Sequence, residues 1–161
     1  MISIEKANEV TLELLQAMMG LVGQLNPQSV PPFPKELEAL LNSECATLFI
    51  AREGEEGPIA GMATLVLYRV PTGLRGHIED VVVYEHLRGK GIGEALTRAC
   101  LDAARQAGAP SVSLTSNPAR VAAITVAVSA PVSATSAAAI AISPWPDAAL
   151  PVSTTEIRSR P

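Results

Sequence analysis

A short basic and glycine-rich turn, RGKGIG at residues 88–93, has the residue types of a phosphate-binding loop. Its three glycines stand at alternate positions: Gly89, Gly91 and Gly93. Glycine lets main-chain amides approach an anion closely, and a helix that starts after the turn adds partial positive charge. Arg88 and Lys90 would add cationic charge at the rim. The turn therefore predicts a ligand that carries phosphate, while a tight strand-to-helix turn without ligand is the competing interpretation.

Two common phosphate loops do not match this turn. A P-loop has Lys and then Ser or Thr after its last glycine, whereas Glu94 follows Gly93 here. A dinucleotide fingerprint has a third glycine shortly afterwards, where this chain has Ala95 and Leu96. It also has an acidic residue at the end of the next strand, and SVSLTS has none. The pattern that remains is Arg-x-x-Gly-x-Gly.

This remaining pattern lies within a longer stretch that resembles a known family. Residues 77–120, from HIEDVVV to SNPAR, are similar to the acetyl-CoA-binding core of the GNAT family of N-acetyltransferases. In that family a long strand, an (Arg/Gln)-x-x-Gly-x-(Gly/Ala) loop, a helix and a further strand follow in this order. The resemblance implies an α/β (α+β) fold with a mixed, largely antiparallel central sheet flanked by helices. It also implies transfer of an acetyl group from acetyl-CoA to a primary amine.

The resemblance further implies which residues meet the cofactor. In the family, the strand before the loop separates from its neighbour, and its unpaired main-chain groups hold the pantetheine arm. On this chain that role falls to the main chain of Val81 and Val83, with the Val81 N–H facing the thioester. The expected cofactor-binding residues are Val81, Val82, Val83, Arg88, Gly89, Lys90, Gly91, Ile92, Gly93 and Asn117.

His77 and Glu79, on the strand before the loop, are the candidate catalytic residues. Acetyl transfer needs a group that takes the proton of the amine and a donor that polarises the carbonyl oxygen. Because side chains alternate along a strand, His77 and Glu79 are expected to share one face with Val81 and Val83. Asp80 would then lie on the other face in a structural role. We favour Glu79 as the base, against an exposed strand carboxylate and a packed histidine as competing interpretations.

Apolar periodicity predicts the elements that must position these residues. The expected elements are strands at 2–5, 77–84 and 111–116, an antiparallel hairpin within 46–70, helices at 8–26, 35–41 and 91–108, and a further helix start at SNPAR, residues 116–120. Asn8 is expected to cap the first helix, and Gly108 to end the third in a left-handed conformation. Loops at 26–34 and 70–76 are expected to shape the acceptor pocket, because loops beside a rigid site commonly set specificity.

Composition restricts the class of protein. The 161 residues fit one domain, and the net charge of −4 gives no broad basic surface for nucleic acid. Neither a signal peptide nor an apolar run of membrane length is recognised, so a cytoplasmic protein without a membrane partner is expected. Cys45 and Cys100 have no metal-site spacing, and no metal is expected. The expected partner is a small-molecule or peptide amine, with a homodimer left open.

The C-terminal segment has a different composition. No charged residue occurs from Val121 to Pro146. In the family, SNPARVAA continues into Arg-Leu-Tyr and then Gly-Phe, and the tyrosine protonates the departing thiolate. Here Ala127 stands near that position, and no tyrosine follows Tyr84. We therefore expect a core at 1–123 and a divergent segment at 124–161, explained by a shifted reading frame or by a native divergent tail. Without the tyrosine, the alternative function is acyl-CoA binding or regulation with little or no turnover.

Overall fold

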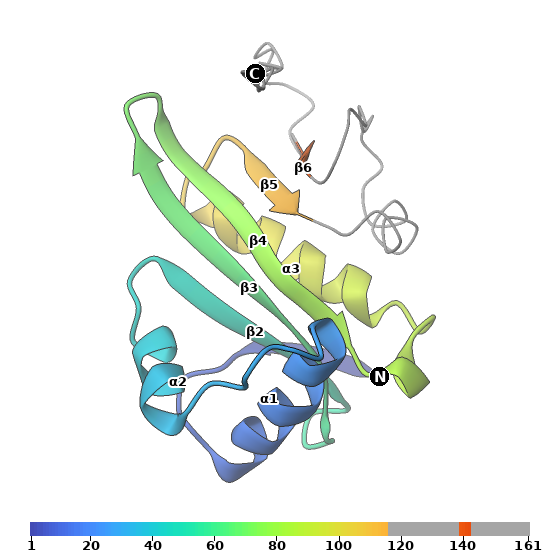
Figure 1. Cartoon of the computed structure of the whole chain (residues 1–161). Helices are drawn as coiled ribbons and strands as arrows, with labels where there is room; N and C mark the ends of the chain where they lie inside the picture. Colours follow the sequence, from blue (N-terminus) through green and yellow to red (C-terminus); the bar gives the residue numbers. More distant parts are fainter. Residues whose placement is uncertain (116–138, 143–161) are drawn as a thin grey trace, which may run out of the picture.

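The computed structural model describes residues 1–115 and 139–142, which form one sheet of six strands between helices (Figure 1). Its strand order is β1-β2-β3-β4-β5-β6, and every neighbouring pair is antiparallel except β4 and β5, which are parallel. This confirms the expected mixed, largely antiparallel sheet. The elements in chain order are β1 (Ile2–Lys6), α1 (Leu12–Leu25), α2 (Pro34–Leu41), β2 (Ala46–Glu53), β3 (Ile59–Val70), β4 (Gly73–Val83), the 3-10 turn η1 (Glu85–Leu87), α3 (Ile92–Gln106), β5 (Val112–Thr115) and β6 (Ala139–Ile142).

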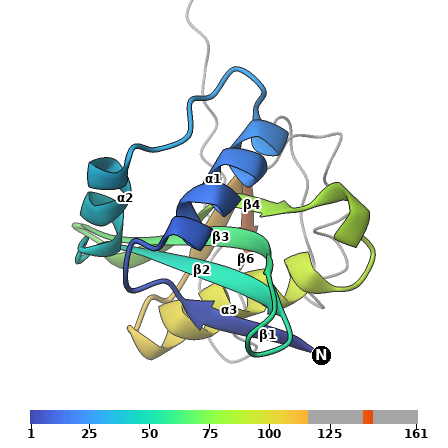
Figure 2. The same ribbon diagram turned by 90° about the horizontal axis from the view of Figure 1, so that it is seen from below.

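Helices cover both faces of the sheet, α1 and α2 on one face and α3 on the other (Figure 2). Each face has its own apolar cluster. On α3 the fully buried residues recur every fourth position, as a helix with one buried stripe requires: Ile92, Leu96, Cys100 and Ala104. On the opposite face, helix α1 packs against the sheet with a matching set: Leu14, Ala17, Met18 and Leu21. The sheet is therefore held between two cores, and β4 contributes to both.

The first helix begins later than its sequence suggested. The expected cap, Asn8, is wrong: the cap is Thr11, whose Oγ1 accepts a hydrogen bond from the Leu14 N–H at 3.0 Å. Both residue types cap helices well, so local preference does not separate them. A start at Thr11 places Glu13 in the first turn, where Arg52 of β2 binds it at 2.7 Å. A tertiary contact thus agrees with the observed start.

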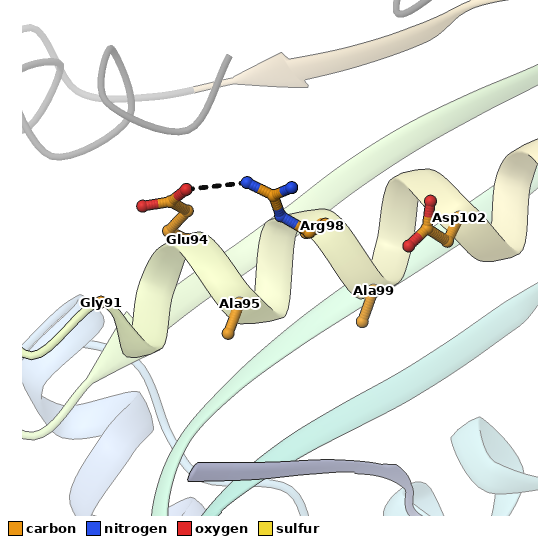
Figure 3. A pocket seen from close by; sticks show the side chains of 6 residues that line it. All are labelled: Gly91, Glu94, Ala95, Arg98, Ala99 and Asp102. Carbon is orange, nitrogen blue, oxygen red and sulfur yellow. Dashed lines mark hydrogen bonds and ion pairs between the residues drawn. The ribbon is translucent and has the colours of Figure 1, made fainter. Parts of the chain in front are cut away.

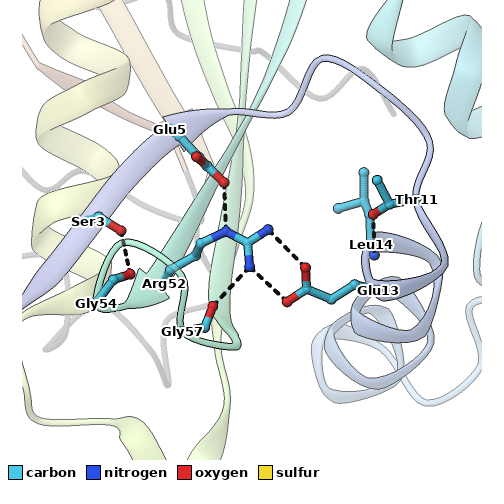
Figure 4. A network of polar contacts seen from close by, with 8 residues as sticks. All are labelled: Ser3, Glu5, Thr11, Glu13, Leu14, Arg52, Gly54 and Gly57. Carbon is cyan, nitrogen blue, oxygen red and sulfur yellow. Dashed lines mark hydrogen bonds and ion pairs between the residues drawn. The ribbon is translucent and has the colours of Figure 1, made fainter.

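Arg52 joins four parts of the fold, as Figure 4 shows. Its Nε donates to Glu5 of β1 at 2.6 Å, and its two terminal nitrogens donate to both oxygens of Glu13 on α1. Nη1 also donates to the carbonyl of Gly57 in the β2–β3 turn at 2.9 Å. The Arg52 side chain is mostly buried, so this network fixes the position of α1 over the sheet.

The expectation of a loop over residues 70–76 is wrong. Strand β3 continues to Val70 and β4 starts at Gly73, with these two residues paired, so the connection is a tight turn of Pro71 and Thr72. Gly73 has a φ of +120°, which only glycine adopts easily and which lets the chain reverse at once. Residues 73–76 therefore belong to the sheet.

Part of the C-terminal segment is described. Strand β6 lies within 124–161 and pairs antiparallel with β5. Asn117, Ala127 and the helix start expected at SNPAR lie outside the described residues. Within the described part of the chain, no helix has the length and apolar character that crossing a membrane requires.

Candidate active site

A bulge in β4 at Asp80 changes which face its side chains occupy. Thr64 of β3 pairs with Glu79 while Met62 pairs with Val82, so β4 has one extra residue between them. Asp80 has a φ of +54°, a left-handed conformation that aspartate tolerates better than most side chains. A bulge of this kind shifts the alternation of side chains by one position.

The expectation that His77, Glu79, Val81 and Val83 share one face is therefore wrong. Ile78 is buried in the cluster against α3, so its neighbours His77 and Glu79 lie on the opposite face. Beyond the bulge, Val81 and Val83 pack against the α3 cluster. Both valine side chains are partly buried there, while their main chain lies along the edge of β4.

Val82 and Ile92, two further expected cofactor residues, have side chains that are buried. Val82 packs in the cluster on the α1 face and is 4% exposed, and Ile92 is 2% exposed on the α3 face. A ligand can reach these residues through main-chain groups alone. The first residues of α3 have amides without a partner inside the helix, so Ile92 and Gly93 can serve as donors.

Strands β4 and β5 pair over a short length and then part. The pairs are Gly76 with Val112, His77 with Ser113, and Ile78 with Leu114. Beyond Ile78, β4 continues to Val83 and pairs only with β3 in the part of the chain that the structure describes. In Figure 1, β5 ends beside the middle of β4, while β4 runs on toward the start of α3. Glu79 is the first residue past the last pair, at the opening between the two strands.

The glycine-rich turn lies at the far end of this unpaired edge. After β4, the turn η1 leads to Arg88, and the chain then takes left-handed conformations at Gly89, with a φ of +79°, and Gly91, with a φ of +77°. Gly91 is the N-cap of α3, and it has no side chain to accept the first amides of the helix. These amides are therefore available to an anion, which the helix dipole also favours.

Both basic side chains of the turn are held by carboxylates. Arg88 pairs with Glu85 at 3.1 Å, and Lys90 pairs with Glu53 at 3.1 Å. Each cation is about half exposed, and surface pairs of this kind are weak, about 0–1 kcal/mol. A phosphate that reaches the turn can therefore compete for them at little cost.

The outer face of α3 has a shallow depression beside this turn, shown in Figure 3. It has a volume of about 330 Å³ and begins at Gly91. Two carboxylates, Glu94 and Asp102, line it with one cation, Arg98, and Arg98 is bound to Glu94 at 2.9 Å. A surface with this charge is a poor place for a pyrophosphate, so the turn itself is the better anion site.

His77 and Glu79, the candidate catalytic residues, are in direct contact. His77 Nε2 lies 2.9 Å from Glu79 Oε1, and its Nδ1 lies 2.5 Å from the hydroxyl of Ser113 on β5. The Glu79 side chain is 48% exposed, so its carboxylate remains accessible at the opening. Sequence reasoning missed Ser113. Its alternation with the buried Val112 and Leu114 places it on one face of β5, but no local pattern pairs it with His77.

Asp80 has an unusual electrostatic environment. Desolvation by burial, and then the charge of neighbouring Glu79, raise the pKa of the Asp80 carboxyl above its usual value. Ionised aspartate at this position therefore has an electrostatic cost. The feature of Asp80 that the bulge uses is its left-handed backbone conformation.

Comparison with known proteins agrees with this arrangement. The sequence profile of the "Acetyltransferase (GNAT) family" matches residues 12–127. Glucosamine 6-phosphate N-acetyltransferase 1 of Oryza sativa subsp. japonica is 30% identical over 115 residues, which cover 66% of this chain and 68% of that protein.

Solved structures share the fold. A glucosamine-6-phosphate N-acetyltransferase from Arabidopsis thaliana has a TM-score of 0.63 at 19% identity, over 84% of this chain and 97% of that one. An aminoglycoside acetyltransferase from a soil metagenomic sample, in complex with sisomicin, has a TM-score of 0.64 at 21% identity, over 99% of this chain and 97% of that one. A protein of Clostridium acetobutylicum described as a predicted acetyltransferase, solved with acetyl-CoA, has a TM-score of 0.60 at 16% identity, over 78% of this chain and 88% of that one. The chain therefore belongs to the GNAT family of N-acetyltransferases, enzymes that take the acetyl group from acetyl-CoA and transfer it to an amine.

Proposed function

We propose that acetyl-CoA lies along the unpaired edge of β4, with its pyrophosphate at residues 88–93 and its thioester beside Val81. The observation that carries this proposal is the position of the β4–β5 opening. It starts at Glu79, and the same strand leads within a few residues to the left-handed glycines that begin α3. One extended ligand can therefore use strand-like contacts at one end and helix amides at the other.

The chemistry follows from groups along this edge. The amine attacks the thioester carbonyl, a C–N bond forms, and the C–S bond breaks. The Val81 N–H stabilises the developing oxyanion. Glu79 takes the proton that the amine loses, and the thiolate departs with the coenzyme. Glu79 suits this task because its carboxylate is accessible at the opening and His77 fixes its orientation.

The acceptor that we propose is a small hydrophilic amine of the amino-sugar class. The rice relative acts on glucosamine 6-phosphate by its name, and the metagenomic neighbour is an aminoglycoside acetyltransferase. The loop at 26–33 is proposed to border the acceptor. Gln24, near the end of α1, accepts a hydrogen bond from the Glu85 N–H at 2.9 Å, so this loop starts beside the C-terminal end of β4.

A thiol-release assay tests the acceptor class. Acetyl-CoA is offered with glucosamine 6-phosphate, an aminoglycoside and a lysine-containing peptide. Faster release with either amino sugar supports the proposal. Release with the peptide alone would assign a peptide amine instead.

Substitution of Glu79 tests the base. Glu79→Gln keeps an oxygen that accepts from His77 but cannot take a proton, so kcat should fall by roughly 10²-fold or more near neutral pH. The loss should shrink at high pH, where more of the amine is already deprotonated. Glu38→Gln on the exposed side of α2 is the control and should leave kcat unchanged. Full activity of Glu79→Gln at neutral pH would remove Glu79 from the mechanism.

The sequence also limits the expected rate. Because no tyrosine follows Tyr84, departure of the thiolate lacks the family's general acid at the equivalent place, and a general acid contributes about 10²–10⁴-fold. A thiolate with an ordinary pKa of about 8.5 still leaves without help, so turnover is expected to be low but measurable. We propose that residues 124–161 come from a shifted reading frame. The gene read in its other two frames should then give Arg-Leu-Tyr and Gly-Phe after Ala123, and neither frame giving them would end this explanation.

A further inference from the structure

His77 is held at both ring nitrogens by side chains from two strands. Its Nε2 contacts Glu79 Oε1 at 2.9 Å, and its Nδ1 contacts Ser113 Oγ at 2.5 Å. Ser113 belongs to β5 and pairs with His77 across the short parallel ladder. The ring is 22% exposed, so it lies mainly within the protein next to the opening at which Glu79 stands.

When the His77 ring is neutral, the donors and acceptors of these three side chains allow one arrangement of hydrogen bonds. An ionised carboxylate only accepts hydrogen bonds, so the Nε2 that faces Glu79 must carry the proton. Nδ1 is then an acceptor, and the Ser113 hydroxyl must donate to it. The opposite tautomer would place two lone pairs against each other between Nε2 and Glu79.

A second acceptor lets the same hydroxyl serve a charged ring. Ser113 Oγ lies 3.4 Å from the carbonyl oxygen of Gly76. When both ring nitrogens carry protons, the hydroxyl can accept from Nδ1 and turn its own proton toward Gly76. Ser113 can therefore satisfy His77 in either protonation state. Its place within the paired part of β4 and β5, with two protein partners, favours this role over that of a nucleophile.

We propose that Ser113 is a positioning residue for acetyl transfer. Its hydroxyl donates to Nδ1 and holds the His77 ring in place, and the Nε2–H that faces Glu79 holds Oε1 so that Oε2 faces the acceptor amine. This inference rests on the proposed role of Glu79 as the proton acceptor, and it adds a third residue to the site from a strand that the glycine-rich motif does not include.

Nitrogen NMR of the histidine side chains tests the tautomer directly. The chain has two histidines, His77 and His86, so a His86→Gln variant assigns both ring signals. The parent protein should show His77 protonated at Nε2. Ser113→Ala should shift the Nδ1 signal, because this nitrogen loses its hydrogen-bond donor, and Ser113→Thr, which keeps a hydroxyl, should keep the parent signal.

Kinetics of the same variants test the consequence. Ser113→Ala should lower kcat by about 3- to 10-fold, as loss of one neutral hydrogen bond would, and leave KM for acetyl-CoA unchanged. Ser113→Thr should recover most of the kcat. Equal losses in the alanine and threonine variants would indicate packing and overturn the proposal, as would an unchanged Nδ1 signal in Ser113→Ala. The Glu79→Gln variant distinguishes the failure of the two proposals. Its full activity would refute the role of Glu79, whereas an impaired Glu79→Gln with an unchanged Nδ1 signal in Ser113→Ala would refute only the role of Ser113.

Discussion

Gly93 offers a test of the phosphate site that leaves the fold intact. It lies in the first turn of α3, and a Cβ added there would meet Val83 Cγ2 at 3.8 Å, an ordinary contact. Alanine also loses less conformational entropy than glycine in a helix, so Gly93→Ala should stabilise the ligand-free protein by up to about 0.5–1 kcal/mol. The melting temperature should then rise by roughly 1–4 °C.

The same methyl group should weaken binding of coenzyme A. In the proposed site, a pyrophosphate oxygen that accepts from the Gly93 amide would approach the main chain where the new Cβ projects. Loss of one hydrogen bond to a charged group costs about 1.5–3 kcal/mol, which corresponds to roughly a 10- to 150-fold increase in Kd. Isothermal titration calorimetry with coenzyme A measures this change, and thermal unfolding measures stability on the same samples.

Gly91 and Gly108 supply the matched comparison. Both have left-handed backbones, with φ of +77° and +82°, and in the described residues no heavy atom lies within 4 Å of an added Cβ at either position. Alanine at either glycine should therefore cost about 1–2 kcal/mol of stability through backbone strain alone. Gly108→Ala, at the other end of α3, should keep the parent Kd, whereas Gly91→Ala should weaken binding. A more stable Gly93→Ala with an unchanged Kd would refute the loop as the pyrophosphate site.

Three further predictions concern groups away from the loop. Arg52→Met should lower the free energy of unfolding by about 1–3 kcal/mol in urea titration, because it removes the contacts to Glu5 and Glu13, and an unchanged midpoint would contradict this. Burial raises the pKa of the Cys100 thiol to about 12, while Cys45 is exposed, so a thiol reagent at about pH 8 should label one cysteine before denaturation and both after it. The raised pKa of Asp80 means that the folded chain binds this proton more tightly than the unfolded chain, so stability falls as pH rises past the ordinary value of about 3.9. Asp80→Asn removes this pH dependence, so the stability of the variant relative to the parent should increase between about pH 4 and about pH 7. A constant difference in stability would show that the carboxyl titrates normally.

Local sequence patterns were enough to predict the order of the elements and the glycine-rich turn of residues 88–93. The hairpin, the three helices and the glycines of residues 88–93 depend on periodicity and turn residues that lie close together in the chain. Gly108 ends α3 with the left-handed conformation that was expected, for the same reason. The resemblance to the GNAT family rested on this local order of strand, loop and helix, and the family match confirmed it.

Contacts between distant segments set which side chains meet at the candidate site. The bulge at Asp80 comes from the pairing of β4 with β3, and it reverses the face on which Val81 and Val83 pack. Ser113 reaches His77 because β5 pairs parallel to β4 over a short ladder and then stops. Strand register is set by contacts between segments distant in the chain, so alternation along one strand cannot predict where it shifts or ends. Glu79 stands at the opening between β4 and β5 for this physical reason.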